Sequence, residues 1–158
     1  IGSVKTGEPV YLDAPHGMFS IDRNPDVPGF VGIVGGIGIT PLMSMMRSMA
    51  ERGDRRPIFL FYANKAWDGI VYREEIDRLQ HRLELTLIHV LEKPPPGWTG
   101  EEGFVDRDVL ARHLPEADVR DLHYFLCGPP PMTKAAEQAL RELGVPVWRI
   151  QTEIFELV

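Results

Sequence analysis

Short apolar runs that alternate with segments of helical spacing constrain this chain of 158 residues more than any other feature. Four strong runs cover residues 30–34, 58–63, 85–91 and 122–127, and a weaker fifth covers 145–150. Runs without polar alternation are typical of strands that are buried on both faces, as in parallel sheets. They predict an α/β fold with three layers, in which a doubly wound, five-stranded parallel sheet lies between helices.

Helix candidates lie between these runs, at residues 41–52, 72–83, 106–114 and 131–143. Each has apolar residues three or four positions apart, and Gly144 follows the last one where a helix cap is expected. Crossovers between parallel strands are right-handed, so the carboxyl ends of the strands meet at one edge of the sheet. Ligands of such sheets bind at that edge, which is where site residues are sought.

Residues 1–28 differ from the rest of the chain. Residues 9–13 form a short strand candidate, and the remainder is rich in proline, glycine and aspartate, which favour turns. We therefore expect two units, 1–28 and 29–158. Because the chain opens at Ile1 without a methionine or a leader pattern, we expect it to be a piece of a longer protein.

Composition excludes several classes of protein. A net charge of −6 argues against a nucleic-acid binder, and the single cysteine excludes an intrachain disulfide or an all-cysteine iron–sulfur centre within this chain. No apolar run reaches the ~18 residues of a membrane span. The five histidines lack metal-ligand spacing. We expect no nucleic acid, no membrane contact within this chain and no metal.

A glycine-rich loop follows the first predicted strand and opens the first predicted helix. It reads Gly35-Gly36-Ile37-Gly38-Ile39-Thr40-Pro41. Glycines let the backbone turn sharply and let a pyrophosphate approach closely. Thr40 is expected to cap the helix, with Pro41 as its first residue. The loop departs from G-x-G-x-x-G and lacks the lysine of a Walker A loop, so a plain tight turn is the alternative interpretation.

A second loop follows the fourth predicted strand, on the same edge of the sheet. It reads Cys127-Gly128-Pro129-Pro130-Pro131-Met132. A small, polarizable cysteine there could pack against a flat ring, and a buried core cysteine is the alternative. No histidine or lysine nearby in the sequence would activate the thiol, so it is not expected to be a nucleophile.

Together these two loops resemble the ferredoxin–NADP reductase family, which includes phthalate dioxygenase reductase, flavin reductases and the electron-transfer modules of NADPH oxidases and ferric reductases. Residues 36–41 match G-x-G-[IV]-[AT]-P, and residues 127–132 match C-G-P-x-x-M. Residues 72–75 and 98–103 are also similar. The resemblance implies that residues 29–158 are a Rossmann-like NAD(P)-binding domain. Residues 1–28 would then be the C-terminal strands of a truncated flavin-binding barrel plus a linker.

The resemblance further implies an NAD(P)H-dependent flavoprotein oxidoreductase, which passes hydride from NAD(P)H to flavin and electrons onward to an acceptor. FAD would be bound mostly outside this chain, which would be inactive alone. The implied partners are the nucleotide, the missing flavin-binding domain and an acceptor that could be a protein, a haem or an iron chelate. A cytoplasmic location, or the cytoplasmic face of a membrane, is expected. A non-catalytic nucleotide-sensing or interaction domain of the same fold is the alternative.

The same resemblance supplies the candidate site residues. Three residues near the nicotinamide and the flavin are the catalytic candidates: Cys127, Glu153 and Phe155. The cofactor-binding candidates follow the predicted strands: Gly35, Gly36, Gly38, Ile39, Thr40, Pro41, Asn64, Lys65, Glu92, Lys93, Cys127, Gly128, Pro129 and Met132.

The choice between NADH and NADPH is expected to depend on charges after the third strand. Relatives specific for NADPH tend to have Ser-Arg where this chain has Glu92-Lys93. Glu92 would repel a 2′-phosphate and could accept a hydrogen bond from a 2′-hydroxyl, whereas Lys65 and Lys93 would attract the phosphate. NADH is weakly favoured, and ordinary loop charges are the alternative interpretation.

Overall fold

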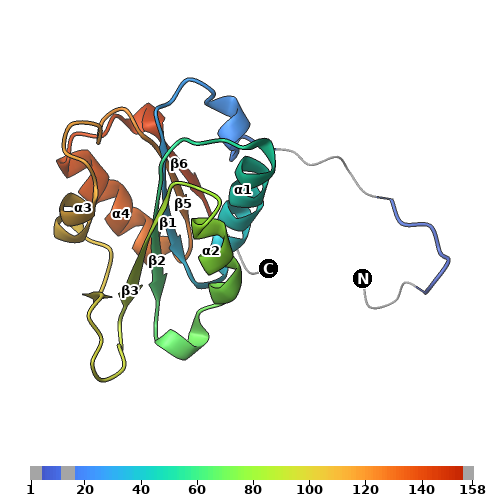
Figure 1. The fold of residues 1–158 in the computed structure, drawn as a ribbon, viewed down its shortest axis with the longest axis horizontal. Coiled ribbons are helices and arrows are strands. Elements are labelled where there is room, and N and C mark those ends of the chain that lie inside the picture. The colour runs from blue at the N-terminus through green and yellow to red at the C-terminus, as the bar shows by residue number, and fades with distance from the viewer. Residues whose placement is uncertain (1–4, 12–16, 155–158) are drawn as a thin grey trace.

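The computed structural model describes residues 5–11 and 17–154, which contain a six-stranded sheet in which every pair of neighbours is parallel (Figure 1). The strand order is β4-β3-β2-β1-β5-β6. The strands are β1 (Phe30–Gly35), β2 (Ile58–Asn64), β3 (Leu85–Leu91), β4 (Glu101–Glu102), β5 (His123–Cys127) and β6 (Ile150–Glu153).

The predicted fold class is confirmed, but the predicted number of five strands is wrong. Strand β4 has two residues, which is too short to form an apolar run, and it exists because Val90 and Leu91 pair with Glu101 and Glu102. The weak candidate at 145–150 begins too early, since β6 starts only at Ile150, after a single 3₁₀ turn.

Within residues 5–11 and 17–154, four α-helices flank the sheet: α1 (Ile39–Arg52), α2 (Arg73–Gln80), α3 (Arg107–His113) and α4 (Pro130–Glu142). The same residues form four 3₁₀ turns: η1 (Ile21–Arg23), η2 (Gly36–Gly38), η3 (Trp67–Gly69) and η4 (Val147–Arg149). Local chemistry sets the helix ends. Gly53 ends α1 in the left-handed conformation at φ 67°, and the Asp106 side chain caps α3 by accepting from the amide of Val109 at 2.8 Å.

Two apolar cores lie on opposite faces of the sheet. Helices α1 and α2 contribute to one core, and α3 and α4 contribute to the other (Figure 1). All six residues of β1 are buried, with Phe30 and Val34 in the first core and Val31 and Ile33 in the second. Burial on both faces is why this strand reads as a continuous apolar run. None of the described helices is long and apolar enough to cross a membrane.

The segment that precedes β1 contributes to the first core. Ile21 and Val27 are buried there, and the Phe19 ring meets the Phe125 ring edge-on with centroids 5.0 Å apart. The strand expected at residues 9–13 is not found at Pro9, Val10 or Tyr11, and the rest of it lies outside the described residues. The division of the chain at residue 28 stays a prediction.

Candidate functional site

The sheet reverses its strand order beside β1. From β1 the chain adds β2, β3 and β4 on one side, and it then adds β5 and β6 on the other side. The loops that leave β1 and β5 lead to helices on opposite faces of the sheet, and open α/β sheets bind their ligands in the crevice at the carboxyl edge beside such a reversal. Val34 pairs with Cys127 at the end of both strands, so the two loops predicted from the sequence flank this crevice.

These two loops touch backbone to backbone because glycines line the contact. A Cβ atom on Gly38 would lie 2.2 Å from the carbonyl oxygen of Cys127 and 3.0 Å from the amide nitrogen of Gly128. A Cβ atom on Gly128 would lie 3.0 Å from the amide nitrogen of Gly35. The Met132 side chain fills the remaining space, since its sulfur would lie 2.7 Å from a Cβ on Gly35. The structure thus brings together Gly35, Gly38, Cys127, Gly128 and Met132.

Gly36, at the start of the glycine-rich loop, borders open space. It has φ 52°, which favours glycine, and a Cβ atom built on it meets no atom within 4 Å. The N-cap residues of η2 and α1 are Gly35 and Gly38, so no cap side chain accepts from the amides at the positive end of the helix dipole. Helix α4 offers less to an anion, because Pro130 and Pro131 have no amide hydrogen.

The expected role of Thr40 as a helix cap is wrong. The turn η2 begins the helical path at Gly36, so α1 starts at Ile39 and Thr40 lies inside it, with Pro41 in third place rather than first. The Thr40 hydroxyl donates to the carbonyl oxygen of Ile37 at 3.0 Å and supports the loop from within. The amide end of α1 is thereby left for a ligand.

Tyr62 supports the glycine loop from β2, and the sequence analysis missed it. Its hydroxyl donates to the carbonyl oxygen of Gly36 at 3.2 Å, and its ring is fully buried. Burial raises the pKa of this phenol, which therefore stays protonated and keeps donating at neutral pH. A tyrosine within an otherwise aliphatic and phenylalanine-rich strand was the available signal.

Cys127 is fully buried beneath the crevice. Its neighbour across the β5–β6 pair is Glu153. Burial, together with the charge of Glu153, raises the pKa of the Cys127 thiol to about 11. A protonated, buried thiol packs and does not act as a nucleophile, in agreement with the sequence-based expectation.

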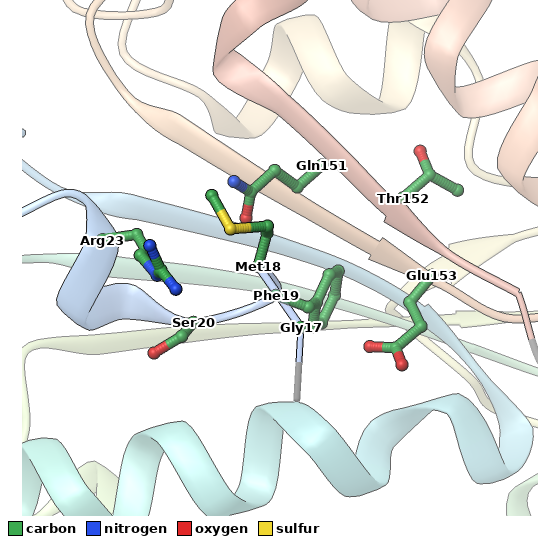
Figure 2. Close-up of a pocket in the computed structure, with 8 residues that line it drawn as sticks. All are labelled: Gly17, Met18, Phe19, Ser20, Arg23, Gln151, Thr152 and Glu153. Carbon is green, nitrogen blue, oxygen red and sulfur yellow. The ribbon is translucent and has the colours of Figure 1, made fainter. Parts of the chain in front are cut away.

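Glu153 is exposed and lines a pocket of about 580 Å³ beside the crevice. Figure 2 shows that β6 forms one wall of this pocket and that residues 17–23 form the other. The lining residues are Gly17, Met18, Phe19, Ser20, Arg23, Gln151, Thr152 and Glu153. Phe155, the third catalytic candidate, lies outside the described residues.

The other candidates meet farther along the same edge, where β2 and β3 end. The amide of Glu92 donates to the carbonyl of Asn64 at 3.1 Å, and the amide of Lys93 donates to the carbonyl of Lys65 at 2.8 Å. The side chains of Lys65, Glu92 and Lys93 are exposed, whereas Asn64 is buried with no partner for its Nδ2 in the part of the chain that the structure describes. Gly35 pairs with Ala63, so this cluster continues the crevice.

Phe104 is a second residue that sequence reasoning missed. Its ring is 68% exposed, and the preceding residue, Gly103, donates its amide to the carbonyl of Leu91 at 2.8 Å. An exposed aromatic ring is thereby held near Glu92. The signal in the sequence was a phenylalanine directly after a turn glycine at the end of a polar loop.

Comparison with known proteins agrees with this geometry. The family model described as the oxidoreductase NAD-binding domain matches residues 33–138, which include both glycine loops and the ends of β2 and β3. This chain belongs to the oxidoreductase NAD-binding domain family. The resemblance to ferredoxin reductases drawn from the two loops is confirmed.

Relatives of this NAD-binding domain include cytochrome b5 reductases. NADH-cytochrome b5 reductase 1 of Pyricularia oryzae is 34% identical over 164 residues, which cover 98% of this chain and 52% of the relative. The cytochrome b5 reductase domain of Ulva prolifera nitrate reductase is 30% identical at a TM-score of 0.69, covering 82% of this chain and 49% of that one. The CS-b5R domains of human Ncb5or, in an NAD⁺ form, are 25% identical at a TM-score of 0.74, covering 88% of this chain and 40% of that one. The chain thus spans about half the length of the curated relatives it matches.

Proposed function

We propose that this chain is the nucleotide-binding part of a reductase that passes hydride from NADH to FAD and electrons onward to an acceptor. The observation that carries the proposal is the arrangement at the carboxyl ends of β1 and β5, where Gly38 packs against the backbone of Cys127 and Gly36 faces open space. A crevice of this kind at the amide end of α1 fits a pyrophosphate. A haem protein of the cytochrome b5 class is the acceptor we propose, and the cytoplasm or the cytoplasmic face of a membrane is the proposed location.

The nucleotide would lie along the carboxyl edge, with its two ends at the two clusters of candidate residues. The pyrophosphate would contact the loop that holds Gly36. The nicotinamide would extend toward Cys127 and Glu153, and the adenosine would extend toward Lys65 and Glu92. We place Gly35, Gly38, Ile39, Pro41, Pro129 and Met132 beneath the nucleotide, where they shape the crevice.

The protein's part in this reaction is to position the reactants. FAD, bound mostly outside this chain, supplies the hydride acceptor. Gly36 leaves room for the nucleotide, and the buried thiol of Cys127 packs under the crevice without taking or giving a proton. Glu153 is exposed at the end of β6 and would face the reacting rings together with Phe155.

Anaerobic stopped-flow measurements on the full polypeptide would test the proposal. We expect NADH to bleach the flavin absorbance in a single turnover, with NADPH slower. Nucleotide binding without any flavin reduction would support a nucleotide-sensing domain of the same fold instead. Absence of binding by either nucleotide would overturn both interpretations.

Substitutions at Glu92 and Lys93 are expected to change nucleotide choice in opposite directions. Glu92→Ser should shift the NADH-to-NADPH affinity ratio toward NADPH by about two- to fivefold, because screened repulsion at an exposed site is modest. Lys93→Ala should shift the ratio toward NADH. Calorimetric titration of both nucleotides measures the two ratios.

The matched control for this pair is Glu84→Ser, which removes an exposed glutamate at the opposite end of β3. It should leave the ratio unchanged. Tighter binding of NADPH to the unmodified protein, with no response to Glu92→Ser, would locate the specificity site elsewhere.

Removal of the Cys127 thiol is expected to slow flavin reduction about tenfold while nucleotide affinity stays within twofold. A void under the crevice would let the nicotinamide shift by part of an ångström, and a displacement of about 1 Å can cost ~100-fold in rate. The comparison requires single-turnover rates and dissociation constants for Cys127→Ala and the unmodified protein. If flavin reduction in Cys127→Ala stays within a factor of two of the unmodified rate, Cys127 only fills space in the core.

A further inference from the structure

Part of one face of the sheet, at β5, is covered by the chain segment that precedes β1. On the face that carries α1 and α2, α1 contacts β1 and α2 contacts β3. Among the described residues, neither α1 nor α2 makes a substantial backbone contact with β5 or β6. Residues 19–27 lie there, with Ile21 and Val27 buried and the Phe19 ring against Phe125. The segment before β1 therefore completes a layer of the fold.

Arg56 holds this segment at the amino edge of the sheet, through a cluster with Asp54, Asn24 and Pro25 that we call the clasp. Its Nη1 donates to the carbonyl oxygens of Asn24 at 3.1 Å and Pro25 at 3.0 Å. Its Nε and Nη2 hold the carboxylate of Asp54, and its guanidinium lies 4.6 Å from the centroid of the Phe30 ring. One side chain thus joins the segment, the α1–β2 loop and the start of β1.

The two charged side chains of the clasp are partly shielded from water. The side chains of Arg56 and Asp54 are 24% and 15% exposed. The hydrogen bond with Arg56 lowers the pKa of Asp54, so the pair is charged at neutral pH. Charge-assisted hydrogen bonds are stronger than neutral ones. Removal of the guanidinium would leave the carbonyls of Asn24 and Pro25 without this donor.

Other contacts to the segment are weaker. The Arg52–Asp22 pair at 2.5 Å is exposed on both sides, which limits its contribution. The Asn24 Nδ2 and His123 Nε2 atoms are 3.4 Å apart. The start of β1, which follows the clasp, is also fixed, because the amide of Phe30 donates to the carbonyl of Pro57 at 2.9 Å.

From the clasp the segment crosses the sheet toward the opposite edge. Asn24 lies beside His123 at the start of β5, whereas Gly17 and Phe19 share a pocket with Glu153 at the end of β6 (Figure 2). The chain upstream of Gly17 thus joins the domain next to the place proposed above for the nicotinamide. The fixed path of residues 17–27 sets where that junction lies.

We propose that Arg56 is a positioning residue for hydride transfer. By holding residues 19–27 against the sheet, it fixes the entry point of the preceding half of the polypeptide beside Glu153. It thereby sets the distance between the flavin carried by that half and the nucleotide carried by this domain. The inference rests on the proposed function for the flavin, whereas the clasp itself does not.

The first measurement is amide hydrogen exchange in the full polypeptide. Arg56→Gln should raise exchange in residues 19–27 at least tenfold, and trypsin should then cleave after Arg23. Arg55→Gln is the matched control, because Arg55 is exposed and has no ion pair in the described part of the chain. If Arg56→Gln fails to fold, Arg56→Lys keeps the charge but not the fork geometry, and it should raise exchange about threefold. Unchanged exchange in both variants would overturn the clasp.

The second measurement is single-turnover flavin reduction at saturating NADH. Arg56→Gln should slow reduction about tenfold while the nucleotide dissociation constant stays within twofold, and Arg56→Lys should recover part of the rate. A normal rate despite raised exchange would overturn the positioning role. Failure of the unmodified protein to reduce flavin would instead overturn the proposed function and, with it, the positioning role, while the exchange result would still stand for the clasp.

Discussion

Phe125→Ala is expected to lower the free energy of unfolding by about 3–5 kcal/mol, the usual range for removing a buried phenylalanine. Phe125 is fully buried in the middle of β5. The centroid of its ring lies 5.0 Å from the ring centroids of Phe19 and His123 and 6.0 Å from that of Phe30. The cavity would open directly beneath residues 19–27. Because residues 19–27 cover Phe125, the cavity can close only if this segment moves. Urea denaturation followed by circular dichroism measures the change.

Phe104→Ala serves as the matched control for this prediction. Its ring is 68% exposed, so the same chemical change should alter the free energy of unfolding by less than about 0.5 kcal/mol. Similar losses in the two variants would contradict the assigned core. Hydrogen exchange in residues 19–27 should rise in Phe125→Ala, since the ring against which Phe19 packs is lost.

Gly38→Ala is expected to weaken nucleotide binding more than tenfold and to lower the free energy of unfolding by about 1–3 kcal/mol, as overpacking does. The new methyl group would lie 2.2 Å from the carbonyl oxygen of Cys127, and backbone cannot move aside as a flexible side chain can. The loops after β1 and β5 would be forced apart, which deforms the crevice. Equilibrium binding of NADH and urea denaturation measure the two effects.

Gly69→Ala is the control for Gly38→Ala, because a Cβ atom on Gly69 meets no atom within 4 Å and Gly69 does not have a positive φ. It should leave binding and stability near those of the unmodified protein. Unchanged binding in Gly38→Ala would show that the nucleotide does not depend on the contact between the two loops.

The strands and the two loops could be predicted because their physical constraints are local. Strand β1 is buried on both faces, so its sequence is apolar throughout, and a backbone contact as close as that of Gly38 tolerates no side chain. Parallel topology then gathers the ends of the strands at one edge. This is why the candidates Asn64, Lys65, Glu92 and Lys93 lie together in the structure.

The features that were missed depend on distant parts of the chain. Strand β4 exists only through its pairing with β3, and two glutamates carry no strand signal of their own. Ile21 and Val27 lie among turn-forming residues without any periodicity, so nothing local indicates that they join the core. The start of α1 was misplaced because Gly36, at φ 52°, begins the helical path before the threonine that would ordinarily cap it.

The burial of Cys127 has a consequence for the chemical durability of this edge. Burial raises the pKa of the thiol to about 11, so it is almost entirely protonated at pH 7, and the sulfur has no contact with solvent. Peroxide and alkylating reagents attack exposed thiolates, so both should modify this cysteine slowly while β5 and β6 stay paired. Because the chain has a single cysteine, its rate of alkylation would report how often the paired ends of β5 and β6 open.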